Sequence, residues 1–133
     1  MKTIFKTLAG AVLACSIAAV PAQAETRAEK GQKELAKMLE GRVAGQPVSC
    51  INQNRTDRLK VIDHTAIVYD AGKTIYVARP SDPRSLDDND ILVINRFGSQ
   101  LCTSDMIRTV DRSAGFMTGV VFLDNFVPYT KAD

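Results

Sequence analysis

The chain has 133 residues, of which 45% are hydrophobic and 24% charged, and 17 basic and 15 acidic side chains give it a formal charge of +2. This length suits one small domain. A balance so close to neutrality does not supply the concentrated basic surface that binds phosphates, so we expect no nucleic-acid partner.

The first 24 residues have the pattern of a secretory signal peptide. Lys2 and Lys6 precede an apolar run over 8–20, which leads to small residues ending at Ala24. We expect cleavage between Ala24 and Glu25 and therefore a periplasmic or secreted protein. The apolar run is shorter than the ~20 residues of a membrane-spanning helix, so we expect no transmembrane segment in the mature chain.

Cys15 leaves a second way of processing this segment open. A lipoprotein would carry a lipid on Cys15 and remain tethered to a membrane. Leu13 is an unusual residue so close to a lipidation site, and the apolar run continues past Cys15, so cleavage after Ala24 is the preferred interpretation. That cleavage removes two lysines and no acidic residue, and the +2 charge therefore belongs to the export signal.

The segment 25–45 is predicted to form an amphipathic N-terminal helix. It contains all four Glu residues of the chain, and Glu favours helices. Thr26 and Glu29 have the spacing of a capping box, and apolar residues recur at helical spacing after them. We predict a helix over 28–40 that ends at a glycine, with Gly31 weakening its first turn by ~1 kcal/mol relative to alanine.

The segment 46–133 is predicted to form a disulfide-linked antiparallel β domain, which makes a single globular domain with the helix. Runs rich in Val, Ile, Tyr and Phe alternate with turn residues there. The predicted strands are 59–62, 66–69, 74–78, 91–95, 106–110, 118–123 and 126–129. The turn 70–73, in which Gly72 can take a positive φ, predicts a hairpin.

These short connections favour antiparallel neighbours, and runs that are apolar on both faces indicate strands covered twice. The predicted fold class is therefore α+β and mainly β. We expect the N-terminal amphipathic helix to pack on a small antiparallel β-barrel or sandwich.

Cys50 and Cys102 are the two cysteines that remain after cleavage, so we predict one disulfide between them. It would close a span of about 50 residues and stabilise the fold by ~4 kcal/mol. The sequence has no C-x-x-C motif, which favours a structural bridge over a redox-active pair.

His64 is the single histidine of the chain, and it lies beside Asp63 between two predicted strands. A small periplasmic hydrolase would use His64 as its general base. The sequence has no G-x-S-x-G motif, and a residue between two strands is more often part of a turn. We therefore assign no catalytic residue and keep His64 as the one weak candidate.

The stretch 80–90 has the densest group of aspartates, and carboxylate oxygens are ligands that Ca²⁺ prefers. Asp87, Asp88 and Asp90 are therefore weak candidates for a calcium site in an envelope protein. Their spacing differs from that of an EF-hand, and such loops are commonly solvated, so we assign no metal and no cofactor.

Four runs of the sequence, 41–51, 85–93, 98–102 and 126–129, resemble small uncharacterised exported proteins of proteobacteria. The resemblance covers most of the segment from about 35 to 129. It implies a shared fold and export, and it assigns no activity and no functional residue.

We expect an exported protein of the cell envelope that acts as a non-enzymatic binding or interaction module. Its partner would be an envelope protein or a small ligand. Such a module should expose an apolar patch or an unpaired strand edge that accepts a partner's strand. The hydrolase with His64 and the calcium-binding envelope protein are the alternatives.

Overall fold

The computed structural model describes residues 23–132. Most of the expected signal peptide, including Cys15, lies outside the described residues, whereas Ala24 and Glu25 are exposed and precede the helix. The helix is α1 (Arg27–Met38). The strands are β1 (Arg42–Ala44), β2 (Cys50–Asn52), β3 (Leu59–Ile62), β4 (Ala66–Asp70), β5 (Thr74–Ala78), β6 (Asp90–Asn95), β7 (Gln100–Cys102), β8 (Met106–Asp111), β9 (Met117–Val121) and β10 (Val127–Lys131). Two 3₁₀ turns, η1 (Thr56–Arg58) and η2 (Pro83–Ser85), precede β3 and β6.

The capping box predicted for the helix is present. The Glu29 N–H donates to the Thr26 hydroxyl at 3.2 Å, and a Glu29 carboxylate oxygen accepts from the Thr26 N–H at 2.7 Å. The bond from the Thr26 N–H, followed by that from its hydroxyl, holds the pKa of Glu29 below its usual value. The helix starts one residue earlier and ends two residues earlier than predicted, and the chain then turns at Gly41, whose φ is +70°.

Within residues 23–132 the strands form three antiparallel sheets. The largest has the order β1-β10-β5-β4-β3, the second pairs β2 with β7, and the third has the order β6-β8-β9. The mainly β fold class is thus confirmed. The closed barrel offered as one of its two forms is wrong, because the three sheets are open: in the described part of the chain β3 and β6 are unpaired edges, and the strands β1, β2 and β7 have only three residues each.

The hairpin predicted at 70–73 joins β4 to β5. The Gly72 N–H donates to the Asp70 carboxylate at 2.7 Å, the Ala71 N–H donates to the Thr74 carbonyl at 2.9 Å, and Gly72 has a φ of +89°. A side chain at Gly72 would disfavour this backbone conformation, so glycine suits the turn.

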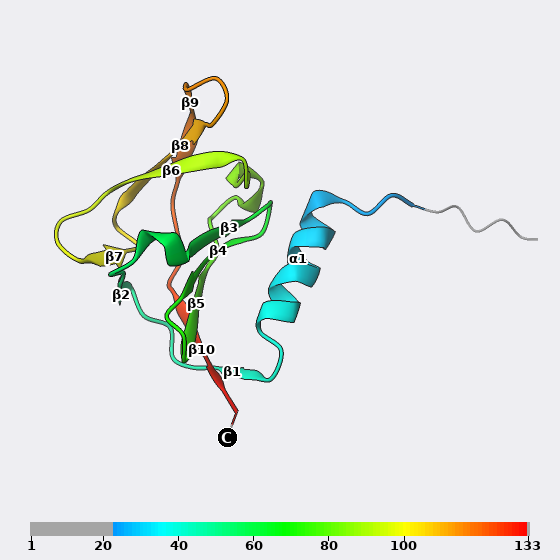
Figure 1. The fold of residues 1–133 in the computed structure, drawn as a ribbon, viewed down its shortest axis with the longest axis vertical. Helices are drawn as coiled ribbons and strands as arrows, with labels where there is room; N and C mark the ends of the chain where they lie inside the picture. The colour runs from blue at the N-terminus through cyan, green and yellow to red at the C-terminus, as the bar shows by residue number, and fades with distance from the viewer. Residues whose placement is uncertain (1–22, 133) are drawn as a thin grey trace, which may run out of the picture.

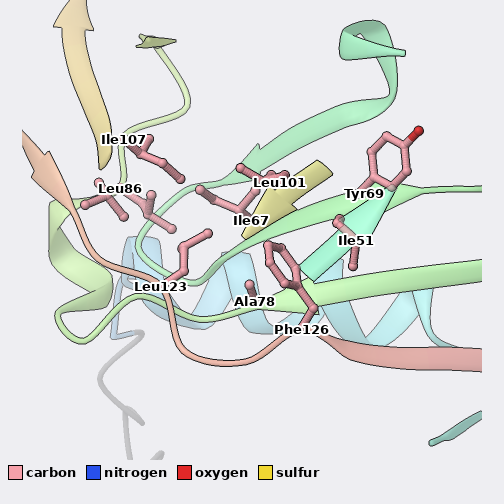
Figure 2. Packing of buried hydrophobic residues seen from close by; sticks show 10 residues of the cluster. Ile51, Ile67, Tyr69, Ala78, Leu86, Leu101, Ile107, Leu123 and Phe126 are labelled. Atoms are coloured by element: carbon pink, nitrogen blue, oxygen red, sulfur yellow. The ribbon is translucent and has the colours of Figure 1, made fainter. Parts of the chain in front are cut away.

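The five-stranded sheet has an apolar core on each face. Helix α1 lies beside this sheet in Figure 1, and Leu35 packs there against Ile62, Val68 and Ile75. The opposite face contributes Ile67 and other residues to a larger core, where side chains from the other two sheets meet them (Figure 2). This larger core contains Ile51, Ile67, Tyr69, Ala78, Leu86, Leu101, Ile107, Val121, Leu123 and Phe126. The molecule therefore has three layers, with the five-stranded sheet in the middle.

Cys50 and Cys102 form the predicted disulfide, with an S–S distance of 2.04 Å. They are direct cross-strand partners in the sheet of β2 and β7, so the bridge joins the two short strands. None of the helices in the described part of the chain is both long enough and apolar enough to cross a membrane.

Candidate functional site

A cleft of about 900 Å³ lies between the edge strands β3 and β6. Leu59 and Val61 come from β3, and Leu92 and Ile94 come from β6. These four side chains are half-buried and pack against the larger core, because alternate residues of each strand face it. The cleft therefore has an apolar floor that is continuous with the core.

Charged side chains surround this floor. The acidic ones are Glu34, Asp88 and Asp90, and the basic ones are Lys60, Arg96 and Arg112. Glu34 and Lys60 neutralise each other, because a Glu34 carboxylate oxygen lies 2.5 Å from the Lys60 ammonium nitrogen. Most of the residues that line the cleft are polar or charged, so it is a polar groove with a narrow apolar floor.

Gln53 forms part of the cleft wall beside Arg96. The Arg96 guanidinium donates to the Gln53 backbone carbonyl at 3.1 Å and to its side-chain oxygen at 2.9 Å. Gln53 is only 2% exposed, and its side-chain NH₂ group has no hydrogen-bond partner within residues 23–132. A buried donor without a partner is costly to the fold.

The aspartates proposed as metal ligands do not all meet. Asp87 and Asp88 lie together with Asp63, so that one carboxylate oxygen from each falls within 4.8 Å of the others. Asp90 is bound elsewhere, because its carboxylate accepts from the Thr118 hydroxyl at 2.6 Å. Asp63, which the sequence motif did not include, therefore takes the place of Asp90 in the acidic cluster.

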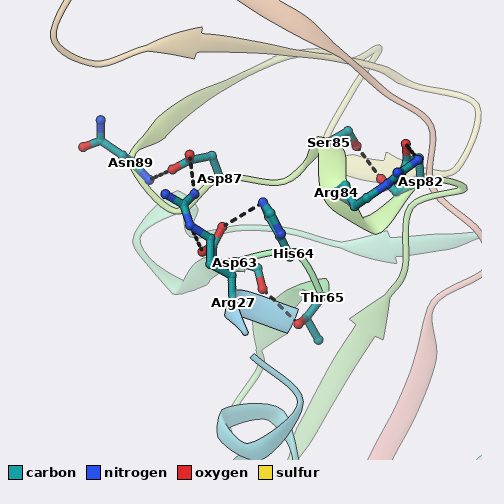
Figure 3. Close-up of polar contacts among 9 residues, drawn as sticks. All are labelled: Arg27, Asp63, His64, Thr65, Asp82, Arg84, Ser85, Asp87 and Asn89. Carbon is teal, nitrogen blue, oxygen red and sulfur yellow. Dashed lines mark hydrogen bonds and ion pairs between the residues drawn. The ribbon is translucent and has the colours of Figure 1, made fainter. Parts of the chain in front are cut away.

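Arg27 balances part of the charge of this acidic cluster. Its guanidinium lies 3.8 Å from an Asp63 oxygen and 3.4 Å from an Asp87 oxygen (Figure 3). The first turn of α1 is thus joined to the turn after β3 and to the loop before β6. The cluster therefore lies where charged residues of the helix and of these two loops meet.

His64 lies in the turn between β3 and β4, where it has a φ of +48°. Its backbone N–H donates to the Leu86 carbonyl at 3.0 Å, and its Nε2 lies 3.9 Å from an Asp63 oxygen. The hydroxyl of Ser85 donates to the Asp82 carbonyl at 2.6 Å (Figure 3). Among the described residues no hydroxyl is hydrogen-bonded to the His64 ring.

Fold and site together define a disulfide-bonded, mainly β domain with a cleft between the edges of two sheets. Comparison of the chain with protein-family models, with curated proteins and with solved structures found no match.

Sequence reasoning did not identify the cleft. Its floor residues were predicted to lie in strands, but which strands form edges depends on the strand order. Gln53 follows the three-residue strand β2, which is too short to show an alternating pattern. In the sequence, Gln53 is recognisable only as a polar residue three positions after Cys50.

Proposed function

We propose that the protein is a non-enzymatic binding module of the cell envelope, and that it holds its ligand in the cleft between β3 and β6. The single observation that carries this proposal is the accessible apolar floor of Leu59, Val61, Leu92 and Ile94 within a charged rim. Burial of these apolar groups by a ligand would lower the free energy of the complex. The charged groups of the rim would orient the ligand and discriminate between ligands.

The side chains of the cleft support recognition better than catalysis. The residues that line it include neither histidine nor cysteine. Acyl transfer needs a nucleophile with an adjacent base, and within residues 23–132 no hydrogen bond joins the Thr56 hydroxyl of the cleft to a carboxylate.

Two observations support an envelope location. The sequence begins with a signal-peptide pattern, and Cys50 and Cys102 form a disulfide. Disulfides persist in oxidising compartments such as the bacterial periplasm.

Photocrosslinking in cells that export the chain tests this proposal. A benzophenone amino acid replaces Lys60 at the cleft, and the control replaces Lys73, which is exposed in the β4–β5 turn. We expect a defined adduct from position 60 and none from position 73.

A second pair of variants connects the adduct to the cleft. Ile94→Trp fills the cleft and should abolish the adduct, whereas Val93→Trp, on the opposite face of β6, should leave it unchanged. Equal adducts from positions 60 and 73, or an adduct that persists in Ile94→Trp, would refute binding in the cleft.

A further inference from the structure

We propose that the ligand in the cleft is an extended polypeptide segment, which pairs with β6 as a fourth strand of the β6-β8-β9 sheet. This inference rests on the proposed function and adds the chemical class of the ligand and its mode of binding. The argument uses backbone groups of both edge strands, the floor of the cleft and its polar end.

The direction of the backbone groups in β8 follows from its last residue. The Asp111 N–H donates to the Phe116 carbonyl at 3.0 Å, and the Asp111 carbonyl accepts from the Gly115 N–H at 2.9 Å. Both backbone groups of Asp111 therefore face the β9 side. In an antiparallel strand, the N–H and C=O groups of successive residues point alternately to one side of the strand and to the other. Val110 and Arg108 therefore direct their backbone groups toward β6.

The register then fixes which residues of β6 are free. Ile91 pairs with Val110, and Val93 pairs with Arg108, so Ile91 and Val93 use their backbone groups within the sheet. Leu92 and Ile94 alternate with them and direct their N–H and C=O groups outward. Within residues 23–132, neither takes part in a backbone hydrogen bond outside the paired strands.

The facing edge of β3 offers a further pair of backbone groups. The Thr65 N–H donates to the Ile62 carbonyl at 3.1 Å, so the Ile62 carbonyl faces the β4 side of the hairpin. By the same alternation Val61 faces outward, and it also forms no backbone bond outside the β3–β4 pairing in the described part of the chain. The cleft is thus bordered on both sides by unpaired backbone donors and acceptors.

These groups favour a polypeptide over other ligands. The N–H and C=O groups of an unpaired strand edge have the same spacing as those of another extended strand. When such a strand is added, these groups form hydrogen bonds with it. Alternate side chains of the bound segment would point to the floor of Leu92 and Ile94, which requires apolar residues at every second position.

One end of the cleft adds charge selectivity. Where β6 begins, Asp88 and Asp90 lie close to Arg112, which donates to the Asn89 carbonyl at 3.3 Å, so that end carries both signs of charge. Arg96 follows the last residue of β6, and a bound segment would place an acidic residue near it.

A synthetic peptide of about six residues tests strand addition directly. Threonine and valine alternate in it, with one lysine and one glutamate at opposite ends, and the control has the same side chains with N-methyl groups on alternate backbone nitrogens. We expect NMR titration of the disulfide-bonded protein to place the first peptide in the cleft. The control should bind at least about tenfold more weakly, because it lacks the backbone donors.

Two protein variants at one position give a matched test. Ile94→Pro and Ile94→Ala both shorten the side chain, but only proline removes the outward N–H, and proline is tolerated where an edge N–H faces solvent. We expect Ile94→Pro to lose peptide binding by about a further tenfold relative to Ile94→Ala. If Ile94→Pro does not fold by circular dichroism, the N-methylated peptide still decides the question.

The outcomes separate the two proposals. Peptide binding in the cleft that is insensitive to both N-methylation and Ile94→Pro would overturn strand addition and leave the cleft as a binding site. Absence of peptide binding would also overturn strand addition, while crosslinking at position 60 would still test the proposed function. Peptide-induced shifts confined to residues outside the cleft would count against both.

Discussion

Gly31 has no side chain, and this allows α1 to lie close to the turn after β3. It lies on the buried face of the helix, and a Cβ atom at this position would overlap the Thr65 hydroxyl and the Asp63 carbonyl. The sequence predicted only the cost of glycine to the helix. The structure shows what offsets that cost, namely close contact between α1 and the turn after β3.

Gly31→Ala is therefore expected to destabilise the protein, although alanine favours helices more than glycine does. The added methyl group must displace backbone of the β3–β4 turn, and overpacking of this kind costs about 1–3 kcal/mol. Urea denaturation measures the change, with Lys30→Ala on the exposed side of the same helix as control. A Gly31→Ala protein as stable as the control would contradict the close contact.

Among the elements, the short sheet of β2 and β7 has a disulfide between its two strands. Each strand has three residues, and Cys50 lies directly opposite Cys102. The Gln53 N–H donates to the Ser99 carbonyl at 3.3 Å just beyond the paired residues, which continues the connection toward the polar end of the cleft. The bridge thus supports one end of the candidate site.

Replacing both cysteines, as Cys50→Ser with Cys102→Ser, should lower the free energy of unfolding by about 2–5 kcal/mol. The bridge restricts the unfolded chain over a sequence separation of 52 residues, and its loss also frees two strands that are short on their own. Urea denaturation of the double variant gives the value, and the wild-type protein under reducing conditions should give a similar one. If neither is destabilised, the bridge has no structural role.

The longer strands could be predicted from the sequence, and the shortest could not. Strands of four to six residues, such as β4 and β6, were predicted because their apolar runs are long enough to recognise. The strands β1, β2 and β7 were not predicted, because three residues do not define a periodicity. The disulfide followed from elimination, whereas the cleft depends on strand order and on groups of the backbone, which residue types do not encode.

For the molecule as a whole, β10 is the strand that connects β1 to the other strands of the largest sheet. It lies between β1 and β5, with Val43 opposite Thr130 and Tyr129 opposite Ile75. Tyr129 also packs against the core beneath α1. A strand near the C-terminus therefore connects β1 to the rest of the sheet (Figure 1).

Deleting the chain from Val127 onward should prevent folding. The deletion leaves β1 without its partner and exposes the full edge of β5 beside a core that has lost Tyr129. Circular dichroism and limited proteolysis should show an unfolded, rapidly degraded chain, whereas a chain shortened only by Asp133 should resist the protease. A folded product from the longer deletion would show that β10 is dispensable.

The position of β10 also determines when the largest sheet can be completed during synthesis. A ribosome releases the chain from the N-terminus, so β1 and β5 emerge long before the strand that must lie between them. The largest sheet cannot be completed until residue 131 is free, and long-range pairing of this kind is slow. A nascent chain with this topology therefore keeps its largest sheet incomplete, with the edge of β5 uncovered, until its last strand arrives.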